Sequence, residues 1–242
     1  MFRYGEKHPV RFELILVVLA FLAAALVTFF LNALCYDPDL SAALARIATG
    51  AGLLVLYRRA LRHGKPFTNL RVAAPALLFA GWNLFYNLSS GMAFGDASCL
   101  ARAAVTALAP AVFEEALFRV VFLHNLRKSG AGDRRCLLIS AAVFAAIHLT
   151  NIVGMDVAGV ALQTAYALVV GLVFGAVYLR NGSAAQIILA HFLTDLTNRI
   201  YAAKASSATM PQLMIFALLL AWEAFYALRL VGGDRSWEVT EP

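Results

Sequence analysis

The sequence predicts an all-α, polytopic membrane protein with about eight transmembrane helices, and three observations lead to this prediction. Of its residues, 62% are hydrophobic and 14% are charged, against about 45–50% and about 25% in an ordinary soluble domain. Apolar runs long enough to cross a bilayer recur along the whole chain. Lipid also requires each backbone polar group to pair within its own segment, which favours helices. This composition excludes a soluble globule, a disordered chain and a disulfide-rich secreted scaffold.

The expected spans are, in order, Leu14 to Tyr36, Leu40 to Tyr57, Val72 to Phe94, Arg102 to Leu126, Cys136 to Met155, Val157 to Leu179, Ser183 to Tyr201 and Ser206 to Leu228. The first is too long for a signal peptide and lacks a cleavage site, so we expect it to be retained. The third is uncharged, whereas the second, fourth, fifth, seventh and eighth contain ionisable residues. Because the polar connections are short, residues 1–242 are expected to form one transmembrane domain.

The distribution of positive charge predicts the orientation. With a cytoplasmic N-terminus, 15 of the 20 Lys and Arg residues fall on inside segments, which places both termini in the cytoplasm. Basic cytoplasmic loops thus explain the net charge of +6, and the expected partner is membrane lipid rather than nucleic acid. The expected location is a cell membrane, specifically a prokaryotic inner membrane. Cys35 and Cys99 would both lie near the outer face, where they either pair or stay free.

Ionisable residues in the fourth span identify a candidate site. A charged side chain at the centre of a membrane helix costs about 2.5–3.5 kcal/mol on insertion scales, so Glu114, Glu115 and Arg119 are expected to face the protein interior. Glu115 and Arg119 are four residues apart and share one helix face, so they are expected to form a structural ion pair. Glu114 points elsewhere and is left as a proton acceptor.

Further polar groups lie in the fifth and seventh spans. His148 is one helical turn beyond Phe144, and Asp195 is one turn beyond His191, with Asn198 about one turn further. Either histidine could instead be a hydrogen-bonding residue between helices.

Three motifs, in this order, resemble those of the CPBP (Abi) family, which includes the type II CAAX prenyl endopeptidases. They are Glu-Glu-x-x-x-Arg at 114–119, Phe-x-x-x-His at 144–148 and His-x-x-x-Asp at 191–195. The resemblance covers a catalytic core of about residues 100–200. It implies an intramembrane endopeptidase that cuts a membrane-associated protein or peptide, for example in its C-terminal tail.

The resemblance also implies roles for these residues. Glu114 would activate a water molecule for attack on the scissile carbonyl, with His148 assisting. His191 and Asp195 would hold the oxyanion or orient the substrate. Glu115, Arg119 and Phe144 would support the site, and Asn151 and Asn198 are candidates for substrate contact, although helix-end capping explains Asn151 equally well.

One position departs from the prenyl-protease branch, which typically has Asn where this chain has Asp195. An ionised Asp cannot donate a hydrogen bond to an oxyanion, whereas Asn can. We therefore expect Asp195 either to be protonated or to orient His191. A prenylated substrate does not follow from the motifs.

Alternatives use the same residues. Glu114, His148 and His191 could hold a divalent metal such as zinc. The chain has no His-Glu-x-x-His motif, so water activation without a metal or other cofactor is the expectation. Two non-hydrolytic functions also remain: a proton-coupled carrier with a Glu–His–Asp relay, and a non-catalytic bacteriocin-immunity or assembly factor, as proposed for some family members.

Overall fold

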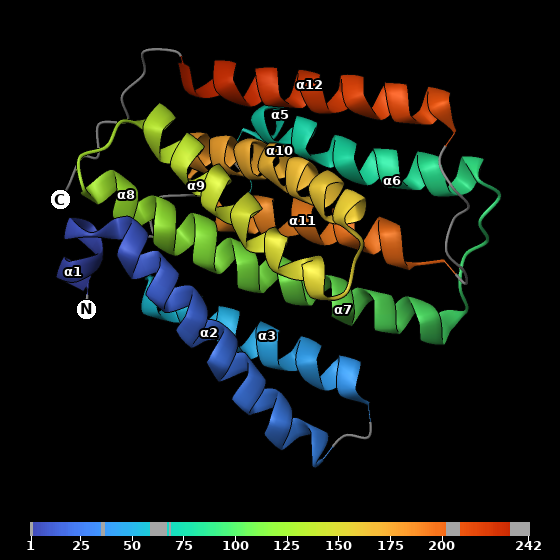
Figure 1. The fold of residues 1–242 in the computed structure, drawn as a ribbon, viewed down its shortest axis with the longest axis horizontal. Coiled ribbons are helices and arrows are strands. Elements are labelled where there is room, and N and C mark those ends of the chain that lie inside the picture. Colours follow the sequence, from blue (N-terminus) through green and yellow to red (C-terminus); the bar gives the residue numbers. More distant parts are fainter. Residues whose placement is uncertain (1, 35–36, 59–66, 68, 202–208, 233–242) are drawn as a thin grey trace.

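The computed structural model describes residues 2–34, 37–58, 67, 69–201 and 209–232, and this part of the chain is helical apart from loops and one isolated bridge between Phe94 and Tyr201 (Figure 1). Its elements are α1 (Phe2–Lys7), α2 (Pro9–Asn32), α3 (Pro38–Leu56), α5 (Leu70–Ala73), η1 (Ala74–Leu77), α6 (Leu78–Ser89), α7 (Ala97–Glu115), η2 (Ala116–Leu123), α8 (His124–Lys128), α9 (Asp133–Ile147), η3 (His148–Val153), α10 (Val157–Asn181), α11 (Ala184–Arg199) and α12 (Met210–Gly232). The predicted all-α class is confirmed.

Each predicted span overlaps a helix or a continuous run of helical segments. Among the described residues, five helices are long and apolar enough to cross a membrane, namely α2, α3, α9 with η3, α10 and α12. The chain is therefore a multi-pass membrane protein. The other expected spans are the run α5–η1–α6, the run α7–η2–α8, and α11, which has only 16 residues. The total of eight spans and the cytoplasmic termini stay predictions.

Several helix starts follow directly from local chemistry. The side chains of Asp37, Asp96, Asp156 and Ser183 accept hydrogen bonds from backbone N–H groups in the first turns of α3, α7, α10 and α11. Such caps satisfy donors that have no partner inside the helix. Helix α10 ends at Gly182, whose φ of 63° lies in the left-handed region that glycine adopts without strain. Caps thus define where the helices that surround the site begin.

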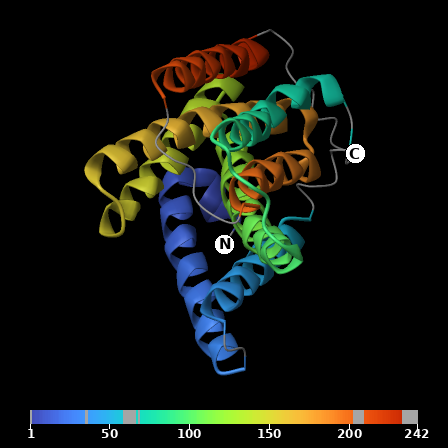
Figure 2. The ribbon, with the colours of Figure 1, turned by 90° about the vertical axis from the view of Figure 1, so that its right-hand side faces the viewer.

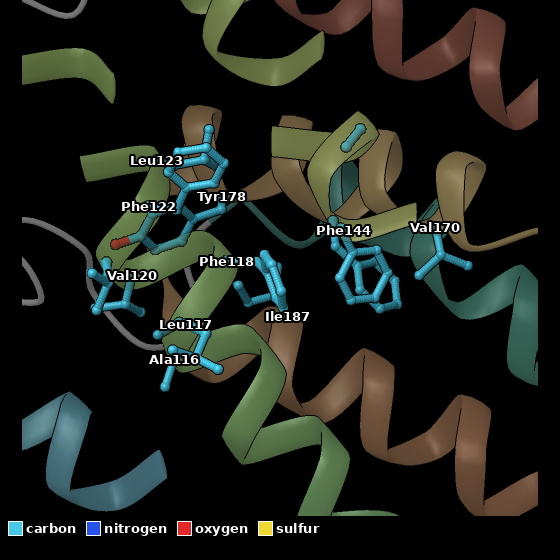
Figure 3. Close-up of a cluster of buried hydrophobic side chains, with 14 of the residues drawn as sticks. Ala116, Leu117, Phe118, Val120, Phe122, Leu123, Phe144, Val170, Tyr178 and Ile187 are labelled. Carbon is cyan, nitrogen blue, oxygen red and sulfur yellow. The ribbon is translucent and has the colours of Figure 1, made fainter. Parts of the chain in front are cut away.

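The run of α7 and η2 lies at the centre of the bundle (Figure 1). Helices α2 and α3 form an arm on one side of it, and α12 lies on the opposite side, as the turned view in Figure 2 shows. All eight side chains of η2 are buried. Figure 3 shows several of them against Phe144, Tyr178 and Ile187, which come from α9, α10 and α11. This cluster holds the central helix against its neighbours.

The fourth predicted span is not one regular α-helix. Its middle, η2, is π-helical, and the segment begins directly after Glu115. Inside α7, Pro110 has no N–H to donate to the carbonyl of Thr106, so the helix lacks one hydrogen bond a turn before Glu114. Short π-helical insertions are often found at functional sites. The irregular backbone therefore flanks the Glu-Glu pair on both sides.

The outward faces of the peripheral helices are apolar. On α2, Phe29 and Leu22 are 72% and 61% exposed, and Leu218 of α12 is 70% exposed. In a membrane protein such side chains face lipid, where they lose nothing by exposure. Cys35 lies outside the described residues, so its pairing with Cys99 is not tested.

Two glycines of α3 provide a matched test of the contact between α3 and α7. A Cβ atom at Gly50 would lie 2.8 Å from Cα of Phe113, whereas a Cβ at Gly52 would meet nothing within 4 Å. We expect Gly50→Ala to lower the free energy of unfolding by about 1–3 kcal/mol, because backbone would have to move. Gly52→Ala should raise it slightly, since Ala favours helix more than Gly does.

The measurement is unfolding of the purified variants in detergent micelles. Equal stabilities for the two alanine variants would contradict the close packing of α3 on α7.

Candidate active site

A buried ion pair anchors the site. Glu115 ends α7 and Arg119 lies in η2, and Nη1 of Arg119 donates to Oε1 of Glu115 over 3.0 Å. Their side chains are 0% and 1% exposed. The predicted pairing at a spacing of four residues is therefore confirmed. A pair so deeply buried can compensate the loss of hydration only with further partners.

Aromatic rings supply part of that compensation. The guanidinium carbon of Arg119 lies 4.3 Å from the ring centroid of Phe144 and 5.9 Å from that of Phe174. Cations over ring faces gain about 2 kcal/mol or more when desolvated. Phe118 packs edge-on against Phe144, with 5.1 Å between centroids. The aromatic residue of the second motif thus supports the arginine of the first.

His191 joins this pair. Its Nδ1 lies 2.8 Å from Oε1 of Glu115, the oxygen that also accepts from Arg119. Because an ionised carboxylate can only accept, this contact places the proton on Nδ1 and leaves Nε2 free to face the site. Glu115 therefore does more than neutralise Arg119, since it also orients the imidazole of His191.

Two further carboxylates lie around the free nitrogen of His191. Nε2 is 3.9 Å from Oε2 of Glu114 and 4.0 Å from Oδ1 of Asp195. The side chains of Glu114 and Asp195 are 25% and 24% exposed, whereas Glu115 is fully enclosed. Asp195 also accepts from Nη2 of Arg199 over 3.2 Å. The structure thus brings together three predicted residues and leaves the two outer carboxylates accessible.

The second predicted histidine is oriented by the backbone. His148 begins η3, and its Nδ1 lies 2.9 Å from the carbonyl oxygen of Phe144. A carbonyl only accepts, so this bond places the proton of neutral His148 on Nδ1 and makes Nε2 an acceptor. His148 is close enough to Glu114 for their charges to interact. It therefore lies at the edge of the same site.

The ligand set considered for zinc was Glu114, His148 and His191. Among the described residues, no group of three or more His, Cys, Asp and Glu side chains is arranged to hold a metal ion. The Nδ1 atoms of both histidines face oxygen atoms of Phe144 and Glu115, so only their Nε2 atoms are available. A site without a resident metal therefore stays a prediction.

Among the described contacts, neither candidate asparagine bonds to Glu114, His148 or His191. Nδ2 of Asn151 donates to Oε1 of Gln163 in α10 over 2.8 Å. Asn198 lines a cavity of about 1090 Å³ between α3, α6, α7 and the end of α11. Phe174, by contrast, touches both Arg119 and His191, with 5.7 Å between its centroid and that of His191, and no sequence motif identified it. Arg199 could have been identified from its spacing of four residues to Asp195.

The buried pair gives a test of what holds the site. Arg119→Gln should lower the free energy of unfolding by about 3–5 kcal/mol, because it leaves the Glu115 carboxylate buried without its cation. The double variant with Glu115→Gln should lose less than the sum of the two single changes. Unfolding in detergent measures both.

The matched control is Arg127→Gln, which removes the partly exposed pair with Asp133 at 3.1 Å. A pair of that kind contributes about 0–1 kcal/mol. A loss at Arg119 no larger than at Arg127 would show that the ion pair does not hold the site.

Comparison with known proteins gives one result. No curated protein and no solved structure matches the chain. Residues 96–197 match the family model described as Type II CAAX prenyl endopeptidase Rce1-like. The matched segment runs from the cap of α7 to the end part of α11 and contains all three motifs. The match agrees with the resemblance seen in the sequence: residues 96–197 are similar to the Type II CAAX prenyl endopeptidase Rce1-like family.

Proposed function

We propose that this chain is an intramembrane endopeptidase of a prokaryotic inner membrane, which hydrolyses a peptide bond of a membrane-associated protein or peptide. The observation that carries the proposal is the approach of the accessible Glu114 carboxylate to Nε2 of His191, whose Nδ1 is bound by Glu115. A general base needs a carboxylate that can reach water, and a developing oxyanion needs a fixed donor. Glu114 and His191 supply these two groups.

In the proposed first step, a water molecule lies between Glu114 and the substrate carbonyl. Nε2 of neutral His148 accepts one of its hydrogen bonds and so orients it. Glu114 takes a proton as the water oxygen bonds to the carbonyl carbon, and the electron pair of the C=O bond moves to oxygen. General-base assistance of this kind contributes about 10²–10⁴-fold to a rate.

Charge balance supports a donor role for His191. Glu114, Glu115 and Asp195 carry three negative charges, and Arg119 and Arg199 carry two positive ones. A proton on Nε2 of His191 would make the cluster neutral. Nε2–H would then donate to the oxyanion, while Asp195 holds the ring in place.

In the second step the tetrahedral intermediate collapses. The C–N bond breaks, the carbonyl re-forms, and Glu114 returns its proton to the leaving amine. The chain thereby supplies the base, the acid and the oxyanion donor from α7 and α11. The proposal involves no resident metal or cofactor, and membrane lipid surrounds the bundle.

Replacing Glu114 separates this proposal from its alternatives. We expect Glu114→Gln to slow cleavage by about 10²–10⁴-fold, since the amide cannot accept the proton of water. The measurement is a proteomic comparison of membranes that contain the wild type or the variant, in which uncut precursors accumulate. Glu13→Gln is the control, because it makes the same replacement at a buried glutamate of α2, outside the Glu–His cluster.

Normal processing by a folded Glu114→Gln variant would overturn the proposed mechanism and favour a non-catalytic partner. A carrier would instead show flux of a solute across sealed vesicles that depends on Glu114.

Metal removal tests the proposed water activation in a second way. Treatment of the purified protein with EDTA or 1,10-phenanthroline should leave cleavage of an identified precursor unchanged, and the protein should hold substoichiometric zinc by elemental analysis. Loss of activity that returns when zinc is added would refute metal-free hydrolysis while leaving the peptidase assignment in place.

A further inference from the structure

The cavity beside α11 lies immediately outside the Glu–His cluster. Its walls come from the first half of α3, the end of α6, the first three turns of α7 and the end of α11. Its volume of about 1090 Å³ is just above the range of about 300–1,000 Å³ for small-ligand pockets, so it has room for a peptide segment. Asp195 connects the two regions, because it faces His191 and pairs with Arg199 in the cavity wall.

The packing of α3 on α7 shows how far Arg46 lies, along the helix axis, from the level of Glu114. The two helices run in the same direction, since Asp37 at the start of α3 pairs with Arg102, and Gly50 lies against Phe113. Arg46 is one turn before Gly50 on the same helix face. It is therefore about 6 Å along the axis from the level of Phe113 and Glu114.

Most of the charge in the cavity wall is already compensated. Arg102 pairs with Asp37 and Asp39, and its guanidinium holds the pKa of Asp37 below its usual range. Arg199 pairs with Asp195. Asp96 accepts from the backbone N–H of Cys99 as the cap of α7.

Arg46 is the exception. Within the described part of the chain it has no hydrogen bond or ion pair, although it lies near the middle of α3, one of the helices able to span the membrane. An arginine at that depth costs about 2.5–3.5 kcal/mol on insertion scales and is normally paired or faces a wet cavity. Its side chain is exposed and lines the cavity, where a bound anion has access to the guanidinium.

We propose that this cavity receives the substrate peptide and that the guanidinium of Arg46 binds a carboxylate of that peptide. The planar guanidinium can hold a carboxylate through two parallel hydrogen bonds, which fixes the orientation of the bound chain. Because Arg46 is about 6 Å along the axis from the level of Glu114, this contact would hold one end of the peptide about one helical turn from the base. This inference rests on the proposed function in one respect only: that function is why we take the bound peptide to be a substrate.

Binding of peptides to a catalytically inactive protein tests the proposal without turnover. The full chain with Glu114→Gln is placed in nanodiscs of phosphatidylcholine, which present no net anionic headgroup. It is exposed to a randomised hexapeptide library with free carboxyl termini and, separately, to the same library with amidated termini. Retained peptides are quantified by mass spectrometry.

We expect peptides that carry a carboxylate to be retained about tenfold more than amidated peptides that lack Asp and Glu, the lower end of what a hydrogen bond to a charged group contributes. Enrichment that disappears with the amidated library identifies the chain terminus as the anion. Enrichment of Asp and Glu that persists in the amidated library identifies acidic side chains.

Adding Arg46→Gln should abolish the enrichment, and Arg46→Lys should keep part of it, because the charge remains but the planar fork is lost. Arg134→Gln, an exposed residue at the start of α9, is the matched control and should change nothing. Absence of enrichment with Arg46 intact overturns the inference whether or not the Arg46 variants fold. Equal enrichment with and without the Arg46 guanidinium overturns it too.

The two proposals fail separately. Selective binding of carboxylates by a chain that never cleaves would refute the peptidase mechanism and leave the anion site. Cleavage that depends on Glu114, but without any preference for carboxylates, would do the reverse.

Discussion

The site depends on one buried contact, in which a single oxygen of Glu115 meets both the guanidinium of Arg119 and the imidazole of His191. This contact joins η2 to α11 at the centre of the bundle and determines which nitrogen of His191 faces outward. Removing charges from water is costly, so such a contact persists only where many neighbours support it. The aromatic rings around Arg119 and the close-packed side chains of η2 provide that support.

The two adjacent glutamates have opposite environments, and the helix itself produces this difference. Successive residues on a helix point about 100° apart, so Glu115 faces the fully enclosed interior while Glu114 reaches the accessible side. One carboxylate is thereby enclosed in the ion pair, and its neighbour is left accessible for the proposed chemistry. The position of α7 along α11 is enough to give the two glutamates these different environments, without any further helix.

Periodicity and spacing predicted most of what lies within one helix. Apolar runs located the helices, and the spacing of four residues predicted the Glu115–Arg119 pair. Contacts between helices were harder to predict from the sequence. The hydrogen bond from His191 to Glu115 and the position of Phe174 depend on packing angles that no local sequence pattern encodes. The π-helical segment was missed for a related reason. Its side chains are as apolar as those of any membrane helix, so the change in backbone pattern leaves no trace in the sequence.

The loop before α7 is joined to the end of α11, because the N–H of Gly95 donates to the carbonyl of Ile200 over 2.8 Å and Phe94 stacks on Tyr201. The helices that bear Glu114 and His191 are therefore fastened together twice, once at their ends and once at mid-depth. Sliding of one helix past the other would break both attachments. We therefore expect α7 and α11 to keep a fixed position relative to each other. If a large substrate enters by a movement of helices, we expect the outer helices to move, because their apolar faces can shift against lipid at little cost.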